Sequence, residues 1–283
     1  VPFQLPDANI SSLSVTQDGT AADLTGVITT ADGSATLNGR YDALTGTFTG
    51  TVVEADAAIA RHWWEGITGG TVSGTVSVRG SSIDGDFDLV NGSVDFQGLQ
   101  ADSVSGPVTM RYPVITTELT GAALGGRIDA TGVVNVAARR WEANGGGSVR
   151  LEDGADWLTR KLLPDGLPID LGGIVDVDLT VVGWDDVDLR GSATGSGMVG
   201  DMALDDLTAT FTLDPATEDL SVDAGAMLGG GPVSFTMGQE RGGTAIRAAL
   251  AGVALAIGGN DLGTLDASLS LVGDSNRSGT LDA

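Results

Sequence analysis

Apolar and polar residues alternate along most of this chain. In the segment IVDVDLTVV, residues 174–182, the odd positions are aliphatic and the even positions include two aspartates and a threonine. Successive side chains of a strand point to opposite faces, so this pattern predicts a strand with one apolar and one acidic face. Similar segments, each ended by Gly or Asp-Gly, recur along the chain and predict roughly 18–20 strands.

One pair of these segments predicts a hairpin. The stretch LTGVITTADGSATLNGRY, residues 24–41, has two alternating runs on either side of Ala31, Asp32 and Gly33. Asp-Gly is a favoured turn between antiparallel strands. We therefore expect two paired strands that turn at residues 31–33.

Two segments, 54–65 and 153–163, break the alternation and have apolar residues at helical spacing. In the second, Trp157 and two leucines share one helical face, Asp153 is a candidate N-cap, and Pro164 ends the helix. Helices this short are unstable alone. We expect both to pack on apolar surface, with the tryptophans as anchors; Trp63 and Trp64 would serve the first.

The two predicted helices also begin an internal repeat. Each is followed by a strand bracketed by glycines, Gly70 and Gly80 in one case and Gly173 and Gly183 in the other, at an offset of 103 residues. This organisation predicts two units, 1–150 and 151–283, in one continuous quasi-linear array. Corresponding apolar positions are Val72 and Val175, Val76 and Leu179, and Val78 and Val181.

The composition favours an extended sheet over a thick core. Aromatic residues make up 5% of the chain, and Gly accounts for 44 of 283 residues. The residues leave two alternatives for the aliphatic faces: a dry core between two sheets, or an open groove lined by small aliphatic groups. The scarcity of bulky partners and the lack of capped repeat ends favour the groove. Its predicted lining is Val72, Val76, Val78, Val175, Val177, Leu179, Val181, Leu255 and Ile257.

The charge of the chain excludes some partners. Its formal net charge is −24, whereas nucleic-acid binding requires a basic surface. The same charge disfavours binding to an anionic membrane surface. The chain has no cysteine, hence neither disulfides nor thiolate metal sites, and no apolar run approaches the ~20 residues of a membrane span. Its first and last residues lead us to expect a segment of a longer protein.

Residues that could support chemistry are few. His62 is the only histidine, and we expect it to be a surface or docking residue, so neither a catalytic triad nor a histidine metal site is predicted. Alternate spacing places the aspartates on the solvated faces of strands, where they also oppose edge-to-edge pairing. The glycine runs 145–147, 191–197 and 229–231 lack the context of a phosphate loop and predict bends or bulges. Residues 248–259 predict a buried or groove-lining strand pair. The acidic clusters are Asp84, Asp86 and Asp88; Asp176 and Asp178; and Asp185, Asp186 and Asp188.

Two longer segments resemble the repeat of TamB and other AsmA-like envelope proteins. The closer one is SVRLEDGADWLTRKLLPDGLPIDLGGIVDVDLTVVGWDDVDLRGSATGSG, and LTGTFTGTVVEADAAIARHWWEGITGGTVSGTVSVRG is looser. The resemblance lies in pattern and composition and covers most of the chain. It contains no catalytic motif.

The resemblance implies an all-β fold, an elongated antiparallel-rich sheet curled into a taco-shaped groove with two short docked helices. It further implies a segment of a longer membrane-anchored protein of the periplasm or cell envelope that passes phospholipid acyl chains between the two membranes, or supports outer-membrane assembly. The implied partners are phospholipid and an outer-membrane barrel of the BamA or TamA type, with no cofactor and no enzymatic activity. The chain lacks the family's N-terminal anchor and C-terminal partner region. The alternatives are a structural or adhesive extracellular β-solenoid and a carboxylate hydrolase, the latter needing converging acidic residues.

Overall fold

The computed structural model describes the backbone of residues 7–62, 66–96, 98–159, 170–184, 187–214, 219–240, 243–257, 260–273 and 278–282. A few side chains next to the gaps in these ranges are not described. The chain forms two compact units. Unit 1 comprises Val1–Ala123 and Arg127–Ala143, and unit 2 comprises Leu124–Gly126 and Asn144–Ala283.

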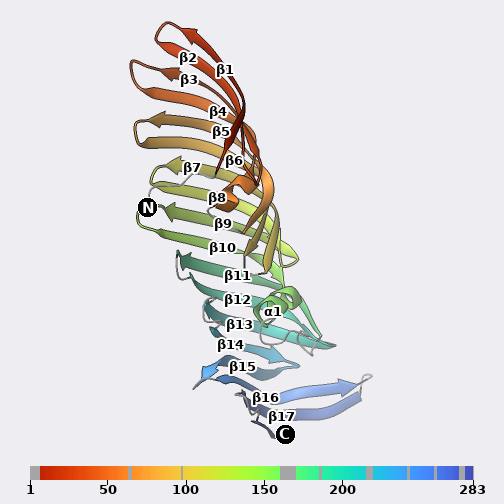
Figure 1. Cartoon of the computed structure of the whole chain (residues 1–283). Helices are drawn as coiled ribbons and strands as arrows, with labels where there is room; N and C mark the ends of the chain where they lie inside the picture. The colour runs from red at the N-terminus through yellow and green to blue at the C-terminus, as the bar shows by residue number, and fades with distance from the viewer. Residues whose placement is uncertain are drawn as a thin grey trace. The chain divides into compact units, whose positions relative to one another are not determined.

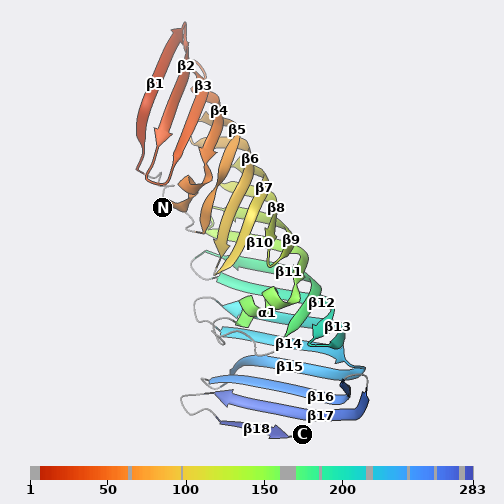
Figure 2. The ribbon, with the colours of Figure 1, turned by 90° about the vertical axis from the view of Figure 1, so that its right-hand side faces the viewer.

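Unit 1 is built from antiparallel strands, each of which pairs with the next from β1 to β8 (Figures 1 and 2). A short 3₁₀ helix, η1 (Ala57–His62), follows the fourth strand. The strands are β1 (Asn9–Asp18), β2 (Ala21–Thr29), β3 (Ser34–Asp42), β4 (Thr47–Asp56), β5 (Ile67–Arg79), β6 (Ser82–Phe96), β7 (Leu99–Arg111), β8 (Val114–Ala123) and β9 (Gly126–Asn135).

Unit 2 repeats this plan. The helix α1 (Leu151–Thr159) precedes a run of antiparallel strands in which each strand from β11 to β18 pairs with the next. The strands are β10 (Arg140–Arg150), β11 (Leu171–Gly183), β12 (Val187–Val199), β13 (Met202–Asp214), β14 (Asp219–Leu228), β15 (Gly231–Glu240), β16 (Gly243–Ile257), β17 (Asn260–Gly273) and β18 (Ser278–Asp282).

The predicted all-β, antiparallel class is confirmed, and so is the hairpin predicted from residues 24–41. Strands β2 and β3 pair, and the Thr30 N–H donates to the Gly33 carbonyl across the turn at 2.8 Å. The prediction of a strand pair within residues 248–259 is wrong for the described part, because residues 248–257 belong to the single strand β16. A bulge at Gly252, whose φ is +63°, interrupts the pairing with β17 and mimics a turn in the sequence.

The register gives the sheet of unit 1 one apolar and one polar face. A row of directly paired residues from β1 to β8 is aliphatic or Gly, and the adjacent row, on the opposite face, is entirely polar. The apolar row is Val15, Leu24, Gly39, Gly50, Val76, Gly85, Met110 and Ile115; the polar row is Ser14, Thr25, Asn38, Thr51, Thr75, Asp86, Thr109 and Thr116.

The sheet of unit 2 has the same two faces. Neighbouring strands again place apolar residues opposite apolar residues and polar residues opposite polar ones. From β11 to β17 the apolar row is Leu179, Gly191, Phe211, Val222, Met237, Ile246 and Leu271; the polar row is Asp178, Ser192, Thr210, Asp223, Thr236, Arg247 and Ser270. We call the faces that carry the two apolar rows the apolar faces.

A line of bulges crosses successive strands of unit 1. Register shifts occur in neighbouring pairs from β4 to β8, and Glu54, Gly70, Asn91 and Ser103 have positive φ at these shifts. Each bulge bends its strand locally. The sheet is nevertheless neither closed nor strongly curled, which differs from the taco-shaped form that the resemblance implies. One localised bend per strand leaves the remainder of each strand regular, so it does not roll a sheet up.

The second predicted helix, 153–163, is present as α1, which begins at Leu151, two residues before the expected N-cap. The first predicted helix, 54–65, is wrong at its start, because residues 54–56 end β4 and only the 3₁₀ segment η1 follows them. Each contacts the strand that follows it, β5 or β11. The repeat also has a structural counterpart: Gly70 and Gly173 have φ of +113° and +132°, and a Cβ built on either would lie 2.6 Å from a glycine Cα on the next strand. Pro164 lies outside the described residues.

Candidate functional site

The predicted lining residues lie in three strands. Val72, Val76 and Val78 are in β5, and all three are half-buried. In β11 the first of the predicted lining residues, Val175, is 3% exposed, whereas the three that follow it on the same face are half-buried. The remaining two, Leu255 and Ile257, belong to β16, and their side chains lie outside the described residues.

The apolar face of unit 1 has no ordinary core beneath it. Among the described residues of this unit, the buried hydrophobic side chains are four alanines and one valine, Val104. The larger apolar side chains of the face, such as Leu24, Leu37 and Val76, are half-buried. Half-burial results from lateral contact within one layer, because a second layer would cover the outer ends of these side chains. The described part of unit 1 thus presents an open apolar surface.

Phenylalanine rings lie over glycines on this face. A Cβ built on Gly50 would lie 2.8 Å from Cζ of Phe48, and one built on Gly74 would lie 2.8 Å from Cδ1 of Phe87. The rings therefore occupy the space that a side chain at the glycine would take.

In unit 2 a Phe ring also lies over a glycine, and more of the hydrophobic side chains are buried. Phe211 is 6% exposed, and a Cβ built on Gly191 would lie 2.8 Å from its Cε2. Leu189, which pairs with Val181, is 1% exposed. The helix α1 covers part of the sheet near β11 through the buried Trp157, as its sequence predicts. The apolar face of unit 2 is therefore partly covered by the chain itself.

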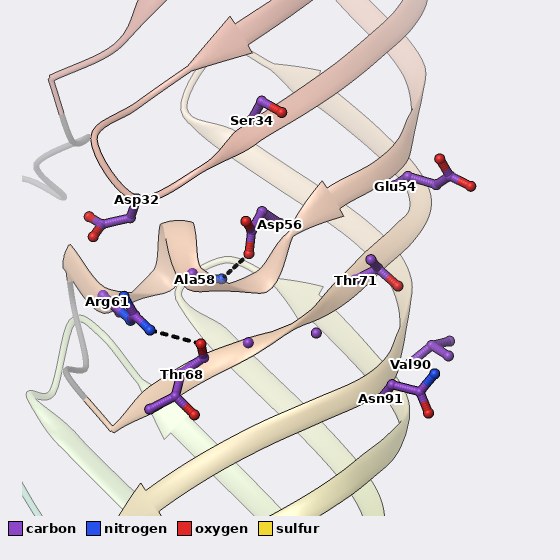
Figure 3. Close-up of a pocket in the computed structure, with 12 residues that line it drawn as sticks. Asp32, Ser34, Glu54, Asp56, Ala58, Arg61, Thr68, Thr71, Val90 and Asn91 are labelled. Atoms are coloured by element: carbon purple, nitrogen blue, oxygen red, sulfur yellow. Dashed lines mark hydrogen bonds between the residues drawn. The ribbon is translucent and has the colours of Figure 1, made fainter.

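A polar hollow of about 610 Å³ lies beside η1 in unit 1 (Figure 3). The Arg61 guanidinium donates to the carbonyls of Ile67 and Thr68 at 2.8 and 2.7 Å, and Asp56 accepts from the Ala58 N–H at 2.9 Å. These bonds cap η1 and hold the chain that leads into β5. None of the predicted lining residues belongs to the hollow, which is formed by Asp32, Ser34, Glu54, Asp56, Ala58, Arg61, Thr68, Gly69, Gly70, Thr71, Val90 and Asn91.

The acidic clusters lie on the polar faces where they are described. Asp176, Asp178 and Asp188 are exposed, as are Asp86 and Asp88. No group of three or more His, Cys, Asp or Glu side chains in the described part of the chain could hold a metal ion. Asp84 is half-buried, and Asp185 and Asp186 lie outside the described residues.

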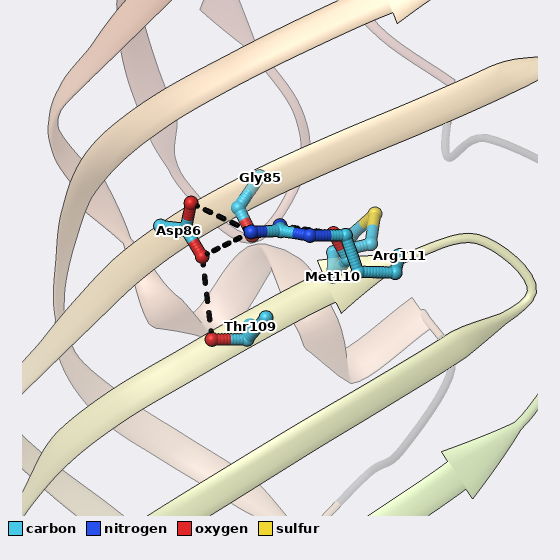
Figure 4. Close-up of polar contacts among 5 residues, drawn as sticks. All are labelled: Gly85, Asp86, Thr109, Met110 and Arg111. Atoms are coloured by element: carbon cyan, nitrogen blue, oxygen red, sulfur yellow. Dashed lines mark hydrogen bonds and ion pairs between the residues drawn. The ribbon is translucent and has the colours of Figure 1, made fainter.

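Asp86 and Arg111 form an ion pair on the polar side of the sheet in unit 1 (Figure 4). Arg111 Nη2 donates to both carboxylate oxygens at 2.9 Å, and Thr109 Oγ1 donates to Oδ1 at 3.3 Å. The other terminal nitrogen, Nη1, donates to the carbonyls of Gly85 and Met110. The Arg111 hydrogen bond lowers the pKa of Asp86 below its usual value. Both side chains are more than half exposed. We therefore infer that the ion pair helps to orient β6 against β7 and adds little to the stability of the fold.

Replacing Arg111 with Gln is expected to raise the pKa of Asp86 towards the ordinary value of about 3.9. A carboxyl whose pKa is lowered by folding stabilises the fold above its unfolded pKa and loses that contribution as the pH falls through its folded pKa. The pair should therefore matter near neutral pH and fade on acidification below about pH 4. Carboxyl NMR titration measures the shift; Arg127→Gln, which removes the guanidinium beside Asp129, is the matched control. An unchanged Asp86 titration in Arg111→Gln would contradict the assignment.

Several other predicted features can be placed. His62 ends η1, but its side chain, like Trp63 and Trp64, lies outside what the structure describes. Within the glycine runs, residues 145–147 are part of β10, 195–197 coincide with a bulge between β12 and β13, and 229–230 form the turn before β15. None of the described helices has the length and apolar character to cross a membrane.

The predicted lining omits much of the apolar faces. Leu13, Leu37 and Phe87 belong to one further row in unit 1, and Phe211 and Met237 to the row in unit 2. The sequence could have identified these residues, since each occupies an apolar position of an alternating segment. The pairing of Phe with Gly had no sequence signal, because it depends on which residues face each other across strands.

The chain matches no protein-family model, no curated protein and no solved structure.

Proposed function

We propose that this chain is a segment of a diderm cell-envelope protein whose apolar sheet faces carry the acyl chains of phospholipids between the inner and outer membranes. The observation that supports this most is the apolar face of unit 1, where Val104 is the only buried hydrophobic side chain larger than Ala among the described residues. A lipid tail would supply the second layer that the protein does not.

The energetics are compatible with passive transfer. Burying a methylene contributes about 0.8 kcal/mol, so a sixteen-carbon tail gains on the order of 10 kcal/mol before ordering costs. That is enough to keep a tail out of water. A bilayer offers the same gain, so a tail on this face would exchange with a membrane without a strong bias in either direction.

The groove in this proposal is shallow. Its floor is the layer of aliphatic side chains and of the Phe rings that lie over glycines, and the line of bulges at Glu54, Gly70, Asn91 and Ser103 bends it. The acidic polar face stays in water, and so does the lipid head group. A periplasmic location, a longer membrane-anchored chain and an outer-membrane barrel partner of the BamA or TamA type belong to the same proposal.

Lipid analysis of the purified chain tests the proposal. We expect phospholipid to co-purify, to be detected by mass spectrometry, and to be displaced by a fluorescent fatty acid that gains emission on binding. A matched protein without an open apolar face, such as a compact β-sandwich of similar charge, should carry none. Absence of both lipid and fatty-acid binding would rule the proposal out.

A structural or adhesive β-solenoid without transport is the second candidate. The observation that favours it is the burial within unit 2, where Leu189 and Val253 are each 1% exposed and Met237 is 3% exposed. If the fatty acid fails to bind but the chain unfolds cooperatively at high denaturant, the scaffold is the better description.

A further inference from the structure

Every second turn of unit 1 lies at the same edge of its sheet, because each strand from β1 to β8 runs antiparallel to the next (Figures 1 and 2). Backbone hydrogen bonds join neighbouring turns of one edge. The Ala43 N–H donates to the Thr20 carbonyl, and the Val136 N–H donates to the Pro113 carbonyl, each at 2.9 Å. The turns of this edge, which we call the tyrosine edge, are 19–20, 43–46, 80–81, 112–113 and 136–139.

Aromatic and aliphatic side chains gather at the tyrosine edge. It holds both tyrosines of the chain, and each of them is 40% exposed. Tyr41 pairs with Phe48 in the outermost row of the apolar face, and the Tyr112 N–H donates to the Ile83 carbonyl at 3.0 Å. Leu44, in the turn 43–46, is 80% exposed. Tyrosine combines an apolar ring with a hydroxyl that stays in water, so it suits the boundary between a lipid tail and its head group.

The tyrosine edge also carries most of the cationic side chains of unit 1. This unit has seven arginines and no lysine, and five of the arginines lie in these turns or in the three nearest residues of a strand. Five carboxylates lie within the same limits, so the edge is neutral overall in a chain of net charge −24. Arg79, at the end of β5, is exposed and forms no ion pair with a described residue. The arginines are Arg40, Arg79, Arg111, Arg139 and Arg140; the acidic residues are Asp18, Asp23, Asp42, Asp84 and Glu142.

The opposite end of the same strands is acidic and polar. The hollow beside η1 lies there, and its lining includes the carboxylates of Asp32, Glu54 and Asp56 (Figure 3). The arginine of this lining, Arg61, already donates to two backbone carbonyls. Clustered carboxylates repel an anionic phosphate, whereas a guanidinium attracts it. A phospholipid head group is therefore better accommodated at the tyrosine edge.

The apolar rows between the two ends are long enough for an acyl chain. From Val78 to Val72, β5 extends about 20 Å, whereas the tails of one bilayer leaflet cover about 15 Å. Over that length the apolar face is aliphatic, aromatic or Gly in β5 and in both of its neighbours. The residues are Phe48, Gly50 and Val52 in β4; Val72, Gly74, Val76 and Val78 in β5; and Ile83, Gly85, Phe87 and Leu89 in β6.

We propose that a phospholipid bound to unit 1 lies with its head group at the tyrosine edge and its tails along the strands, towards the line of bulges. This orientation rests on the proposed function and adds a head-group site to it. The Tyr41 and Tyr112 hydroxyls donate to the phosphate and ester oxygens, and the Arg79 guanidinium binds the phosphate. The tails cover the apolar rows from Val78 to Val72.

A fluorophore at either end of β3 tests the orientation. The chain has no cysteine, so a single introduced one can be labelled. Ala43→Cys and Ala31→Cys are matched, because both alanines are exposed in turns that flank the nine residues of β3. These turns lie about 30 Å apart along the strand. A phospholipid with a nitroxide on its head group should quench the label at position 43 severalfold more than the label at 31, and a nitroxide at the tail end should reverse this order.

The outcomes separate the orientation from lipid binding itself. If the head-group-labelled lipid binds but quenches both positions equally, or position 31 more, the orientation is overturned and the proposed function stands. If neither labelled lipid binds, the proposed function fails and the orientation fails with it.

A pair of charge variants tests the contribution of Arg79. Arg79→Glu should weaken binding of a short-chain phosphatidylglycerol about threefold, the scale of an exposed charge pair. Arg127→Glu makes the same charge change near the start of β9, at the opposite end of the strands, and should leave this affinity unchanged. Both variants should bind a diacylglycerol of the same chain length as the unaltered chain does, because this lipid has no phosphate. Equal weakening by the two variants, or a loss of diacylglycerol binding in Arg79→Glu equal to that of phosphatidylglycerol, would overturn the head-group site.

Discussion

Replacing Val177 and Leu179 together with Asp is expected to weaken binding of a fluorescent fatty acid by about 100-fold. The two side chains are half-buried on the apolar face of unit 2, where they pair with Ala193 and Gly191. Removing contact with about four methylenes, at ~0.8 kcal/mol each, accounts for a loss of this size. Fluorescence titration of the full chain measures the affinity, and transfer of a labelled phospholipid between vesicles measures the activity.

The control changes the opposite face of the same strand. Asp176→Asn with Asp178→Asn removes two charges from exposed positions and should leave fatty-acid affinity within about twofold. Val177→Thr keeps nearly the volume of the side chain and introduces one hydroxyl, so it tests the same face if the aspartates prevent folding. Circular dichroism reports folding in each case. Equal losses from charge changes on both faces would contradict the proposed binding surface.

Replacing Phe211 with Ala is expected to destabilise unit 2 by about 3–5 kcal/mol, the usual cost of removing a buried aromatic side chain. The ring is 6% exposed and lies over Gly191, which has no side chain to fill the vacated space. Urea unfolding followed by circular dichroism gives the change in free energy. Leu271→Ala, at a side chain 39% exposed on the same apolar row, should cost far less.

Gly191, beneath the Phe211 ring, allows a test in which the effect of one substitution on folding stability depends on the ring. Gly191→Ala alone should destabilise the fold, because its Cβ would collide with Phe211. In the Phe211→Ala background the same change should cost much less or become stabilising. The close neighbour that the new Cβ would then meet is Leu179 Cδ2, 2.8 Å away at the end of a flexible side chain, and Ala loses less backbone entropy on folding than Gly. Additive effects of the two substitutions would show that the ring does not occupy the space above Gly191.

Local patterns in the sequence predict much of this fold. Alternation in segments such as 174–182 identifies the strands and their apolar phase, and Asp32-Gly33 identifies the turn between β2 and β3. Helical spacing around Trp157 identifies α1 and the residue that anchors it. Where a bulge interrupts a strand, as at Gly252, the sequence resembles a turn, and one strand is taken for two.

The sequence predicts the candidate site only in part. The phase of each strand places Val76, Val177 and Leu179 on apolar faces, but a linear pattern does not reveal which strands carry a second layer. Leu189 is buried and Leu24 is half-buried, although the two lie in segments that alternate equally well. The difference arises from contacts between residues far apart in the chain.

The two-faced strands, their antiparallel order and the acidic polar faces follow from local patterns in the chain, because side-chain alternation and turn chemistry are local. Long-range contacts were needed to show that Phe211 lies over Gly191 and that unit 1 leaves its apolar face open. These features depend on cross-strand register and on the absence or presence of a covering layer. Both are set by long-range pairing, which no window of the sequence contains.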